Sequence, residues 1–404
     1  MCNELGHPIA RDSIANTVEE QGDDSFGVRE LVSTLKLFLD DGKRPNNLYN
    51  VYLESAIEVF DTCALLLTGK LPQVDKLPSV PCRIGLGNQY LFLNRSKTVF
   101  LVTPSSNCEE IAQLPLPKQI AQFSNIVEVS CGSHCLMLDD EGNVFSFGDT
   151  NKYGQLGREG DLATHKPRQI EVHGIQSICC GFEHSTLVTR DGFLITFGRN
   201  DDGQLGNGNL TSTWQPCKVP DIEVVRTVKC GRAHTLVHCN DGAVYFFGNN
   251  MEGQSSYPTL DGYRIVNPTR IVPDSNIMEI ACGAMLSCFL LDDGTVFRTS
   301  KLSSRHTLTR VKEIPHILQI SCCNNLILAL DVKGFVWIID ESSEPQKLES
   351  CPMLMLPSGI AEFGFLRDFK GTLWAFNTNS SFPDLRMLPE QYHSRIASPK
   401  SAKK

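Results

Sequence analysis

Hydrophobic and polar residues alternate in short runs along most of this chain, and glycine-containing turns separate the runs. Between residues 177 and 198 the sequence reads SICC, a Gly-Phe-Glu-His corner, STLVT, Asp191-Gly192 and FLITFG. Alternation with a period of two is typical of half-buried β-strands. Asp-Gly between two such runs favours a hairpin, because a type I′ turn needs positive φ. The pattern therefore predicts antiparallel strands.

Three stretches of this kind, starting at Cys131, Cys180 and Cys230, are nearly copies of one another and lie about 50 residues apart. Each holds a histidine eight residues before a turn glycine: His134 and Gly142, His184 and Gly192, His234 and Gly242. The same frame finds four weaker copies, at Leu286 and Gly294, Leu326 and Gly334, Phe363 and Gly371, and Gln89 and Lys97. The sequence therefore contains seven repeats.

A repeat of this size is too small to bury its own apolar face, so neighbouring copies must stack. Several hairpins at this spacing are typical of a β-propeller built from four-stranded blades. We predict an all-β fold, a seven-bladed β-propeller over residues 46–385. Repeat spacings of 49 to 52 residues fall to 40 and 36 after residue 283, which predicts trimmed outer strands there.

The two ends of the chain differ from the repeats. Residues 1–45 form an acidic N-terminal arm, and apolar residues at helical spacing predict a short amphipathic helix over 25–40. That helix packs across the propeller edge or serves as a partner-binding element. The segment from Leu48 to Leu67 is expected to pair with the last blade, near 359–376, and so close the ring. Residues 386–404 are predicted to be a basic, flexible C-terminal tail.

The repeat resembles that of the regulator of chromosome condensation propellers, which have Cys/Ser-Gly-x-x-His, a strand, Asp-Gly, a second strand and a Gly-Gln-Leu-Gly end. The match is strongest from Cys131 to Ser256. WD repeats are disfavoured because the chain has no Trp-Asp dipeptide, and kelch repeats because their double glycine is missing. The resemblance implies a protein-binding propeller and, in some members, nucleotide exchange on a Ran-like small GTPase through corner residues and an inserted hairpin. Here the corresponding connections are short.

Composition narrows the functional classes. The chain has 404 residues, 41% of them hydrophobic, and a net charge of -9, which disfavours binding to nucleic acid. No apolar run is long enough for a membrane span, and the N-terminus does not read as a signal peptide. Five of the sixteen cysteines, Cys131, Cys180, Cys230, Cys282 and Cys322, lie about a blade apart at equivalent positions, so we expect free thiols and a location in the cytosol or the nucleus.

No constellation of residues predicts catalysis, a metal or a cofactor. The repeated residues are expected to be structural: His134, His184, His234, Gly142, Gly192, Gly242 and Gly294. Function is expected on surface loops, and the candidate partner-binding residues are Ser133, Glu183, Arg232, Asp201 and Asp202. We expect a monomeric, non-enzymatic interaction propeller, a scaffold or regulatory adaptor acting on a small-GTPase pathway. The alternatives are an exchange factor for a Ran-like GTPase and a chromatin-associated adaptor.

Overall fold

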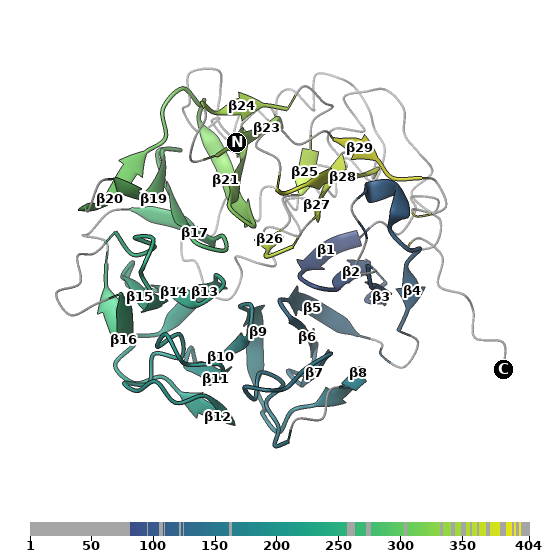
Figure 1. Cartoon of the computed structure of the whole chain (residues 1–404), viewed down its shortest axis with the longest axis vertical. Coiled ribbons are helices and arrows are strands. Elements are labelled where there is room, and N and C mark those ends of the chain that lie inside the picture. Colours follow the sequence, from purple (N-terminus) through teal and green to yellow (C-terminus); the bar gives the residue numbers. More distant parts are fainter. Residues whose placement is uncertain are drawn as a thin grey trace, which may run out of the picture. The chain divides into compact units, whose positions relative to one another are not determined.

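Seven blades, each of four antiparallel strands, form a ring in the described part of the chain (Figure 1), and a short parallel strand joins two of the blades in one nine-stranded sheet. The computed structural model describes residues 81–396, with gaps at 95, 105–107, 109, 121–122, 124, 161–163, 257–262, 272–275, 303–304, 332–333, 341–343, 349–352, 356–357, 362, 369–371, 380–384, 390–391 and 393–395. These residues belong to one compact unit, Leu77–Lys404. The predicted all-β, seven-bladed propeller is confirmed.

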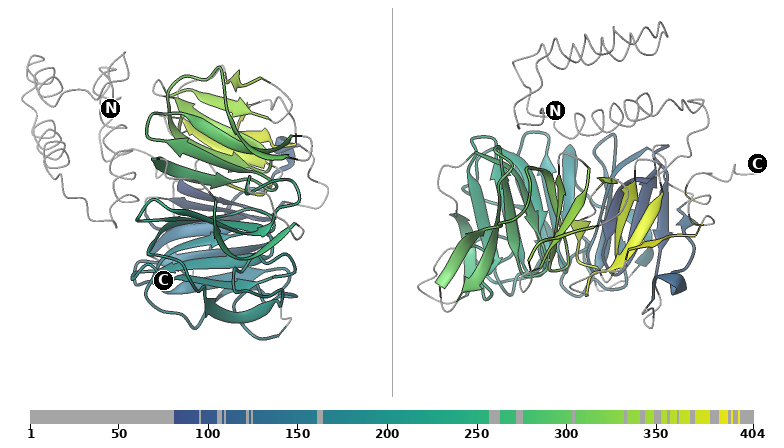
Figure 2. Two further views of the ribbon diagram at one scale, coloured as in Figure 1. Left: turned by 90° about the vertical axis from the view of Figure 1, so that its left-hand side faces the viewer. Right: turned by 90° about the horizontal axis from the view of Figure 1, so that it is seen from above.

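Each blade runs outward from the centre of the ring through four strands in chain order, and Figure 2 shows the blades from two further sides. The first strands of blades 1 to 7 are β1 (Pro81–Leu86), β5 (Ile126–Cys131), β9 (Ile175–Cys180), β13 (Val225–Cys230), β17 (Ile277–Cys282), β21 (Ile317–Cys323) and β25 (Met353–Met355). The second strands are β2 (Tyr90–Asn94), β6 (His134–Asp139), β10 (His184–Thr189), β14 (His234–Cys239), β18 (Ser287–Leu291), β22 (Leu326–Asp331) and β27 (Phe363–Asp368).

The outer half of each blade completes the sheet. The third strands are β3 (Val99–Val102), β7 (Val144–Gly148), β11 (Leu194–Gly198), β15 (Val244–Asn249), β19 (Val296–Leu302), β23 (Val336–Ile339) and β28 (Leu373–Asn377). The fourth strands are β4 (Lys118–Gln119), β8 (Thr164–Gln169), β12 (Thr213–Lys218), β16 (Arg264–Arg270), β20 (Arg305–Arg310), β24 (Gln346–Lys347) and β29 (Arg386–Met387). One 3-10 turn, η2 (Ile111–Gln113), lies between β3 and β4.

The hydrophobic core lies between blades and not within them. Each of the five core clusters combines side chains from at least two neighbouring blades. For example, Leu136 of blade 2 and Leu187 of blade 3 belong to one cluster, and both are fully buried. Stacking therefore supplies the burial that a single repeat lacks, as the repeat length predicted.

The ring closes between blades 7 and 1. The short strand β26 (Ser358–Gly359) of blade 7 pairs in parallel with β1 of blade 1 and with β21 of blade 6. The ring of Phe365 in blade 7 meets Tyr90 and Phe92 of blade 1 edge-on, each at 5.2 Å between centroids. Three predictions concern residues outside the described part of the chain. They are the pairing of Leu48–Leu67 with this blade, the helix over 25–40 and the arm 1–45.

Part of the predicted C-terminal tail belongs to the core. Leu388, Tyr392 and Ile396 are buried, and the Nδ2 of Asn94 in blade 1 donates to the Ile396 carbonyl at 3.0 Å. These three apolar residues are spaced by four, a pattern that the basic charges around them concealed. The prediction of a flexible tail is therefore wrong for this part of 386–404.

The predicted trimming of outer strands is correct for blades 6 and 7, where β24 and β29 have two residues each. It is wrong for blade 5, whose outer strand β20 has six residues. There the missing residues come from the connection between the third and fourth strands, since β19 ends at Leu302 and β20 begins at Arg305.

The turn glycines have the predicted positive φ: Gly142 +92°, Gly192 +80°, Gly242 +87° and Gly294 +76°. In each hairpin, however, the preceding residue has no positive φ, so these are not two-residue type I′ turns. In blade 3, Gly192 N donates to Thr189 O at 2.8 Å and Thr189 N to Phe193 O at 2.9 Å. This arrangement is a longer connection whose last turn residue is the left-handed glycine.

A pair of glycine substitutions separates backbone strain from crowding. A Cβ on Gly242 has no atom within 4 Å, whereas a Cβ on Gly192 would lie 2.3 Å from Val224 Cγ1. We expect Gly242→Ala to lower the free energy of unfolding by about 1–2 kcal/mol through left-handed backbone strain alone. Gly192→Ala should cost about 1 kcal/mol more. Urea unfolding measures both; the double variant Gly192→Ala/Val224→Ala should lose the excess, and an equal cost for the two single variants would contradict the assignment.

Candidate protein-interaction face

The ring has two faces with different loops. The Gly-x-x-His corners, between first and second strands, lie beside the connections between third and fourth strands: Arg199 N donates to Glu183 O and Asn249 N to Ala233 O, both at 2.8 Å. We call this side the corner face. The hairpins of Gly142 and Gly192 lie on the other side, next to the connections between blades, where Val225 N donates to Gly192 O at 2.9 Å.

Neighbouring corners touch through their backbones. Asn88 N donates to Gly132 O, and Ser133 N to Phe182 O, both at 2.8 Å. Arg232 N donates to Ala284 O at 3.1 Å. A Cβ on Gly132 would lie 1.8 Å from the Gly181 carbonyl oxygen, so only glycine allows this approach. The corner face is therefore a rigid backbone platform.

Below the platform, buried histidines join blade 2 to blade 3, blade 3 to blade 4 and blade 4 to blade 5. The Nε2 atoms of His134, His184 and His234 lie 2.6 Å from Ser185 Oγ, 3.0 Å from Thr235 Oγ1 and 3.4 Å from Ser287 Oγ, respectively. The Ser185 hydroxyl donates to the Gln155 carbonyl at 2.9 Å, so it accepts the proton carried by the histidine Nε2. The prediction that these histidines are structural agrees with their burial at 0–1% exposure.

Burial keeps these imidazoles neutral. It lowers the pKa of His134 and of His234 to about 4, and that of His184 to about 3. Their Nδ1 atoms have no hydrogen-bond partner, so a second proton there would be buried without an acceptor. None of the three can meet a partner protein.

The connections on the corner face are held by asparagine and glutamine side chains that sequence reasoning missed. In blade 3, the Asn200 Oδ1 accepts from Leu205 N, and the Gln204 Oε1 from Asp202 N, each at 3.0 Å. Asn151 and Gln155 in blade 2, and Asn250 and Gln254 in blade 4, make the matching bonds to Leu156, Tyr153, Ser255 and Glu252. The sequence signal that could have identified them is that these asparagines and glutamines recur at equivalent positions of the repeat.

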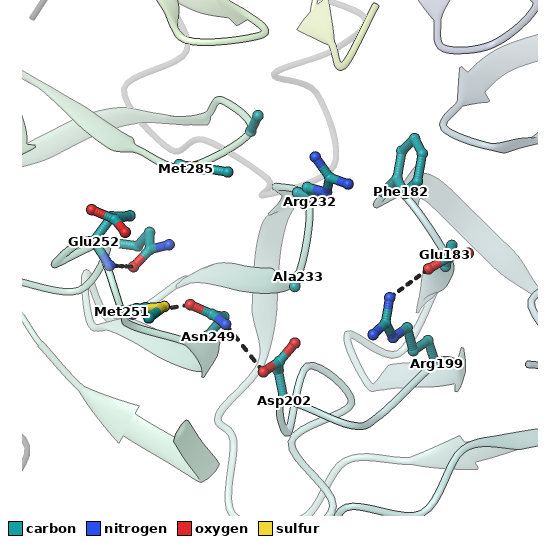
Figure 3. A pocket seen from close by; sticks show the side chains of 12 residues that line it. Phe182, Glu183, Arg199, Asp202, Arg232, Ala233, Asn249, Met251, Glu252 and Met285 are labelled. Atoms are coloured by element: carbon teal, nitrogen blue, oxygen red, sulfur yellow. Dashed lines mark hydrogen bonds and ion pairs between the residues drawn. The ribbon is translucent and has the colours of Figure 1, made fainter. Parts of the chain in front are cut away.

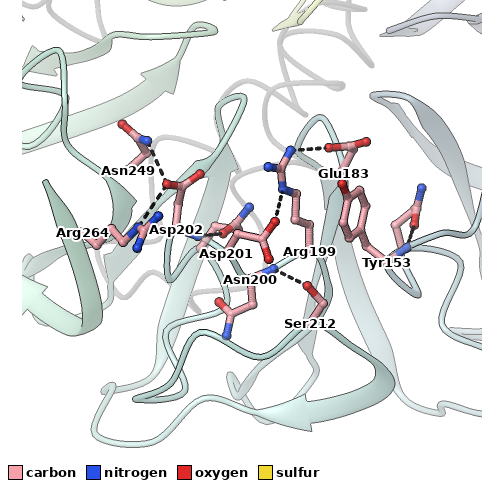
Figure 4. Close-up of polar contacts among 11 residues, drawn as sticks. Tyr153, Glu183, Arg199, Asn200, Asp201, Asp202, Ser212, Asn249 and Arg264 are labelled. Carbon is pink, nitrogen blue, oxygen red and sulfur yellow. Dashed lines mark hydrogen bonds and ion pairs between the residues drawn. The ribbon is translucent and has the colours of Figure 1, made fainter.

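Charged side chains on this platform form two groups (Figure 4). In the first, Arg199 bridges two carboxylates: its Nη1 lies 2.7 Å from Glu183 Oε2 and its Nε 3.0 Å from Asp201 Oδ2. Its guanidinium also lies 5.0 Å from the centre of the Tyr153 ring. In the second, Asp202 Oδ1 accepts from Asn249 Nδ2 at 3.1 Å and lies 3.6 Å from Arg264 Nε. Glu183, Asp201 and Asp202 therefore share one face, through contacts that chain distance does not reveal.

Between blades 3, 4 and 5 the corner face is hollowed into a pocket of about 290 Å³, which we call the corner pocket (Figure 3). Its corner residues are Phe182, Glu183, Arg232, Ala233, Ala284 and Met285. Its loop residues are Arg199, Asp202, Asn249, Met251, Glu252 and Gln254. The Arg232 guanidinium lies 5.0 Å from the centre of the Phe182 ring, a cation–π distance.

Four of the five candidate partner-binding residues are brought together here. Glu183, Asp202 and Arg232 line the corner pocket, and Asp201 joins them through Arg199. Ser133 does not lie in the pocket: it is 7% exposed, and its backbone N–H donates to blade 3 across the seam, as we call the contact between two neighbouring blades. Met251 and Met285, 54% and 43% exposed, were missed because an isolated methionine has no sequence signal for exposure.

The twelve cysteines whose side chains the structure describes are free. Burial raises the pKa of Cys180, Cys230 and Cys282 well above the usual range of a thiol, whereas the hydrogen bond with Cys230 lowers the pKa of Cys179. No group of three or more histidine, cysteine or acidic residues in the described ranges could hold a metal ion. Within the same ranges, no helix is long and apolar enough to cross a membrane.

The neutral histidines make stability depend on pH. A histidine with a pKa of about 6.5 when unfolded and 3 to 4 when folded binds its proton only in the unfolded chain between those values, so stability falls as pH drops below about 6.5. The free energy of unfolding should decrease by about 2 kcal/mol per histidine between pH 7 and 5. Glu279 acts in the opposite direction and offsets the loss caused by one histidine. Burial raises the pKa of Glu279 to about 7, so the proton that it binds stabilises the folded state as pH falls.

Urea unfolding at pH 7 and 5 tests this linkage. His184→Gln should reduce the pH-dependent loss by about 2 kcal/mol, whatever its own stability at pH 7. His173→Gln, which changes an exposed histidine, should leave the loss unchanged. An equal pH dependence in wild type and His184→Gln would show that His184 is not a neutral strut.

Comparison with known proteins identifies the repeats. The model of the regulator of chromosome condensation (RCC1) repeat matches residues 141–188 and 191–238, and a second model of this repeat matches 175–204. Protein RCC2 homolog of Danio rerio is 33% identical over 139 residues, which cover 28% of this chain and 28% of that protein. The human RCC1-like G exchanging factor-like protein is 35% identical over 121 residues, or 27% and 25% of the two chains. The match thus spans about a quarter of the length of these relatives.

The fold of this chain matches solved structures over a larger part of its length. Human WBSCR16 superposes with a TM-score of 0.60 at 20% identity and covers 69% of this chain and 84% of its own. Saccharomyces cerevisiae Prp20p, whose structure was described with its binding properties to Gsp1p and histones, has a TM-score of 0.58 at 15% identity and covers 78% and 83%. These likenesses concern the fold. The chain is therefore a seven-bladed β-propeller that carries repeats of the regulator of chromosome condensation (RCC1) type between residues 141 and 238.

Proposed function

We propose that this chain is a non-enzymatic protein-interaction propeller, a scaffold or regulatory adaptor on a small-GTPase pathway, and that it docks partners through the corner pocket. The observation that carries the proposal is the pocket itself. Two ion-paired groups and three projecting side chains, Arg232, Met251 and Met285, stand on backbone that the seams hold rigid. Arginine, methionine and aromatic residues on a rigid support are typical of interface centres.

The pocket is better suited to binding than to chemistry. Its carboxylates at Glu183 and Asp202 are already paired with Arg199 and Arg264, and no histidine is among the described residues that line it. Such pre-paired groups cost little to order on binding, which preserves affinity for a partner surface. The GTPase part of the proposal rests on likeness to an RCC1-like G exchanging factor-like protein and to Prp20p.

Guanine-nucleotide exchange on a Ran-like GTPase is the second candidate, and the same likenesses favour it. An exchange factor binds the nucleotide-free GTPase best and so speeds nucleotide release. In the described residues, each of these connections in blades 2 to 4 begins with a tight turn that its own asparagine closes, and none of these turns forms an inserted wedge. This favours adaptor function over exchange.

A panel of purified small GTPases, Ran included, tests both candidates. We expect the full chain to retain one or more of them without accelerating nucleotide release. The pocket variant Arg232→Ala/Met251→Ser/Met285→Ser should lose retention, since it removes the three projecting side chains. The matched control Phe193→Ser/Val224→Ser, which removes exposed apolar side chains from the hairpin side, should keep it.

Other results would favour a different function or a different docking face. Faster nucleotide release would establish the exchange alternative. Retention that the hairpin-side control abolishes and the pocket variant preserves would move docking to the other face. Retention on DNA that weakens steeply with salt would favour the chromatin-associated alternative, because counterion release gives that dependence.

A further inference from the structure

Among the described residues, Arg232 of the corner pocket has no carboxylate partner. Arg199 is held by Glu183 and Asp201, and Arg264 lies beside Asp202. Arg232 is exposed, and among the described residues no carboxylate lies within ion-pairing distance of it. Its own backbone N–H is fixed to the Ala284 carbonyl, and its guanidinium rests on the Phe182 ring. The charge is therefore oriented before any ligand arrives.

An apolar contact surface lies in the same pocket. Met251 and Met285 are both exposed, but their backbones are anchored: Met251 N donates to Asn249 Oδ1 at 2.9 Å and Met285 N to Asn325 Oδ1 at 3.1 Å. Their flexible thioethers can fit differently shaped apolar side chains. Blade 5 contributes no long connection here, since β19 and β20 are separated by only two residues.

The distribution of charge sets the direction of a ligand. Glu252 also lines the pocket, and in Figure 3 it lies on the side away from Arg232 and Phe182. A ligand carboxylate is thus attracted at the Arg232 side and repelled at the Glu252 side. Guanidinium and carboxylate pair through two parallel hydrogen bonds, which gives both strength and orientation.

From these features we infer that the corner pocket recognises a short acidic–apolar segment of a partner protein. An aspartate or glutamate side chain of that segment pairs with Arg232, and an adjacent apolar side chain packs on Met251 and Met285. This inference rests on the proposed docking role of the pocket and specifies the chemistry of its partner. A single protein carboxylate suits the site better than a nucleic acid, because a chain with a net charge of -9 repels the many phosphates of a nucleic-acid backbone more strongly than one carboxylate.

Selection from a random-peptide phage library on the immobilised full chain tests the inference. Selected peptides should be enriched in aspartate or glutamate next to an apolar residue. In fluorescence polarisation, Arg232→Glu should weaken a selected peptide roughly tenfold to a hundredfold, the range for a charged hydrogen-bonded pair. Replacing the peptide's acidic residue by lysine should restore binding to Arg232→Glu and weaken binding to wild type.

Matched controls make the result specific. Arg310→Glu changes an exposed arginine at the end of β20, outside the pocket, and should leave affinity unchanged. Met285→Ser should weaken the peptide, whereas Trp214→Ser, at an exposed apolar residue outside the pocket, should not. Thermal melting confirms that each variant is folded.

Three outcomes would overturn the inference. They are selected peptides without acidic enrichment, acidic peptides that bind Arg232→Glu as well as wild type, and Arg232-dependent retention of a single-stranded oligonucleotide in place of peptides. Pocket-dependent binding of non-acidic peptides would reject the acidic partner while keeping the docking role. Binding that no pocket variant changes would reject both.

Discussion

The close approach of backbones at the corners is the constraint on which this molecule depends. The corner glycines of neighbouring blades lie so near the next blade's carbonyls that a single added carbon on Gly87, Gly132 or Gly283 would lie within 1.8 to 2.3 Å of an oxygen. This contact sets how far each blade reaches toward the centre of the ring. It also aligns the backbone hydrogen bonds from Asn88, Ser133 and Arg232 to the following corner. The core clusters between blades can form only at this spacing.

The seams tolerate polar groups because those groups are paired across blades. Histidine Nε2 meets a hydroxyl of the following blade, and that hydroxyl in turn donates to a carbonyl of the blade before it. Cysteine sulfur atoms of the first strands lie 3.4 Å from carbonyls of the preceding blade at Cys180 and Cys282. A neutral hydrogen bond of this kind gives direction to a contact that apolar packing alone would leave free to slide. Stability and blade register therefore come from the same residues.

The suitability of the corner face for binding follows from its rigid backbone. The corners and the connections beside them are fixed by backbone bonds and by buried asparagines, so their backbone needs no further ordering when a partner binds. On this support the sequence varies: Phe182 and Glu183 in blade 3, Arg232 in blade 4, Met285 in blade 5. Repetition of the buried positions and variation of the outer ones give a uniform scaffold that carries the corner pocket.

The sequence by itself determined the strand type, the number of blades and the turn positions, and it singled out the repeated histidines, which the structure buries. These follow from local rules: period-two alternation, glycine at positive φ, and a unit too small to bury its own face. It also placed Glu183, Arg232, Asp201 and Asp202 among the candidates. Only the tertiary structure decided that Arg199 joins Glu183 to Asp201, that Ser133 is buried in a seam, and that Met251 and Met285 are exposed. Which surface residues meet depends on how blades are spaced around the ring, and that spacing is a property of contacts between repeats, which no single repeat encodes.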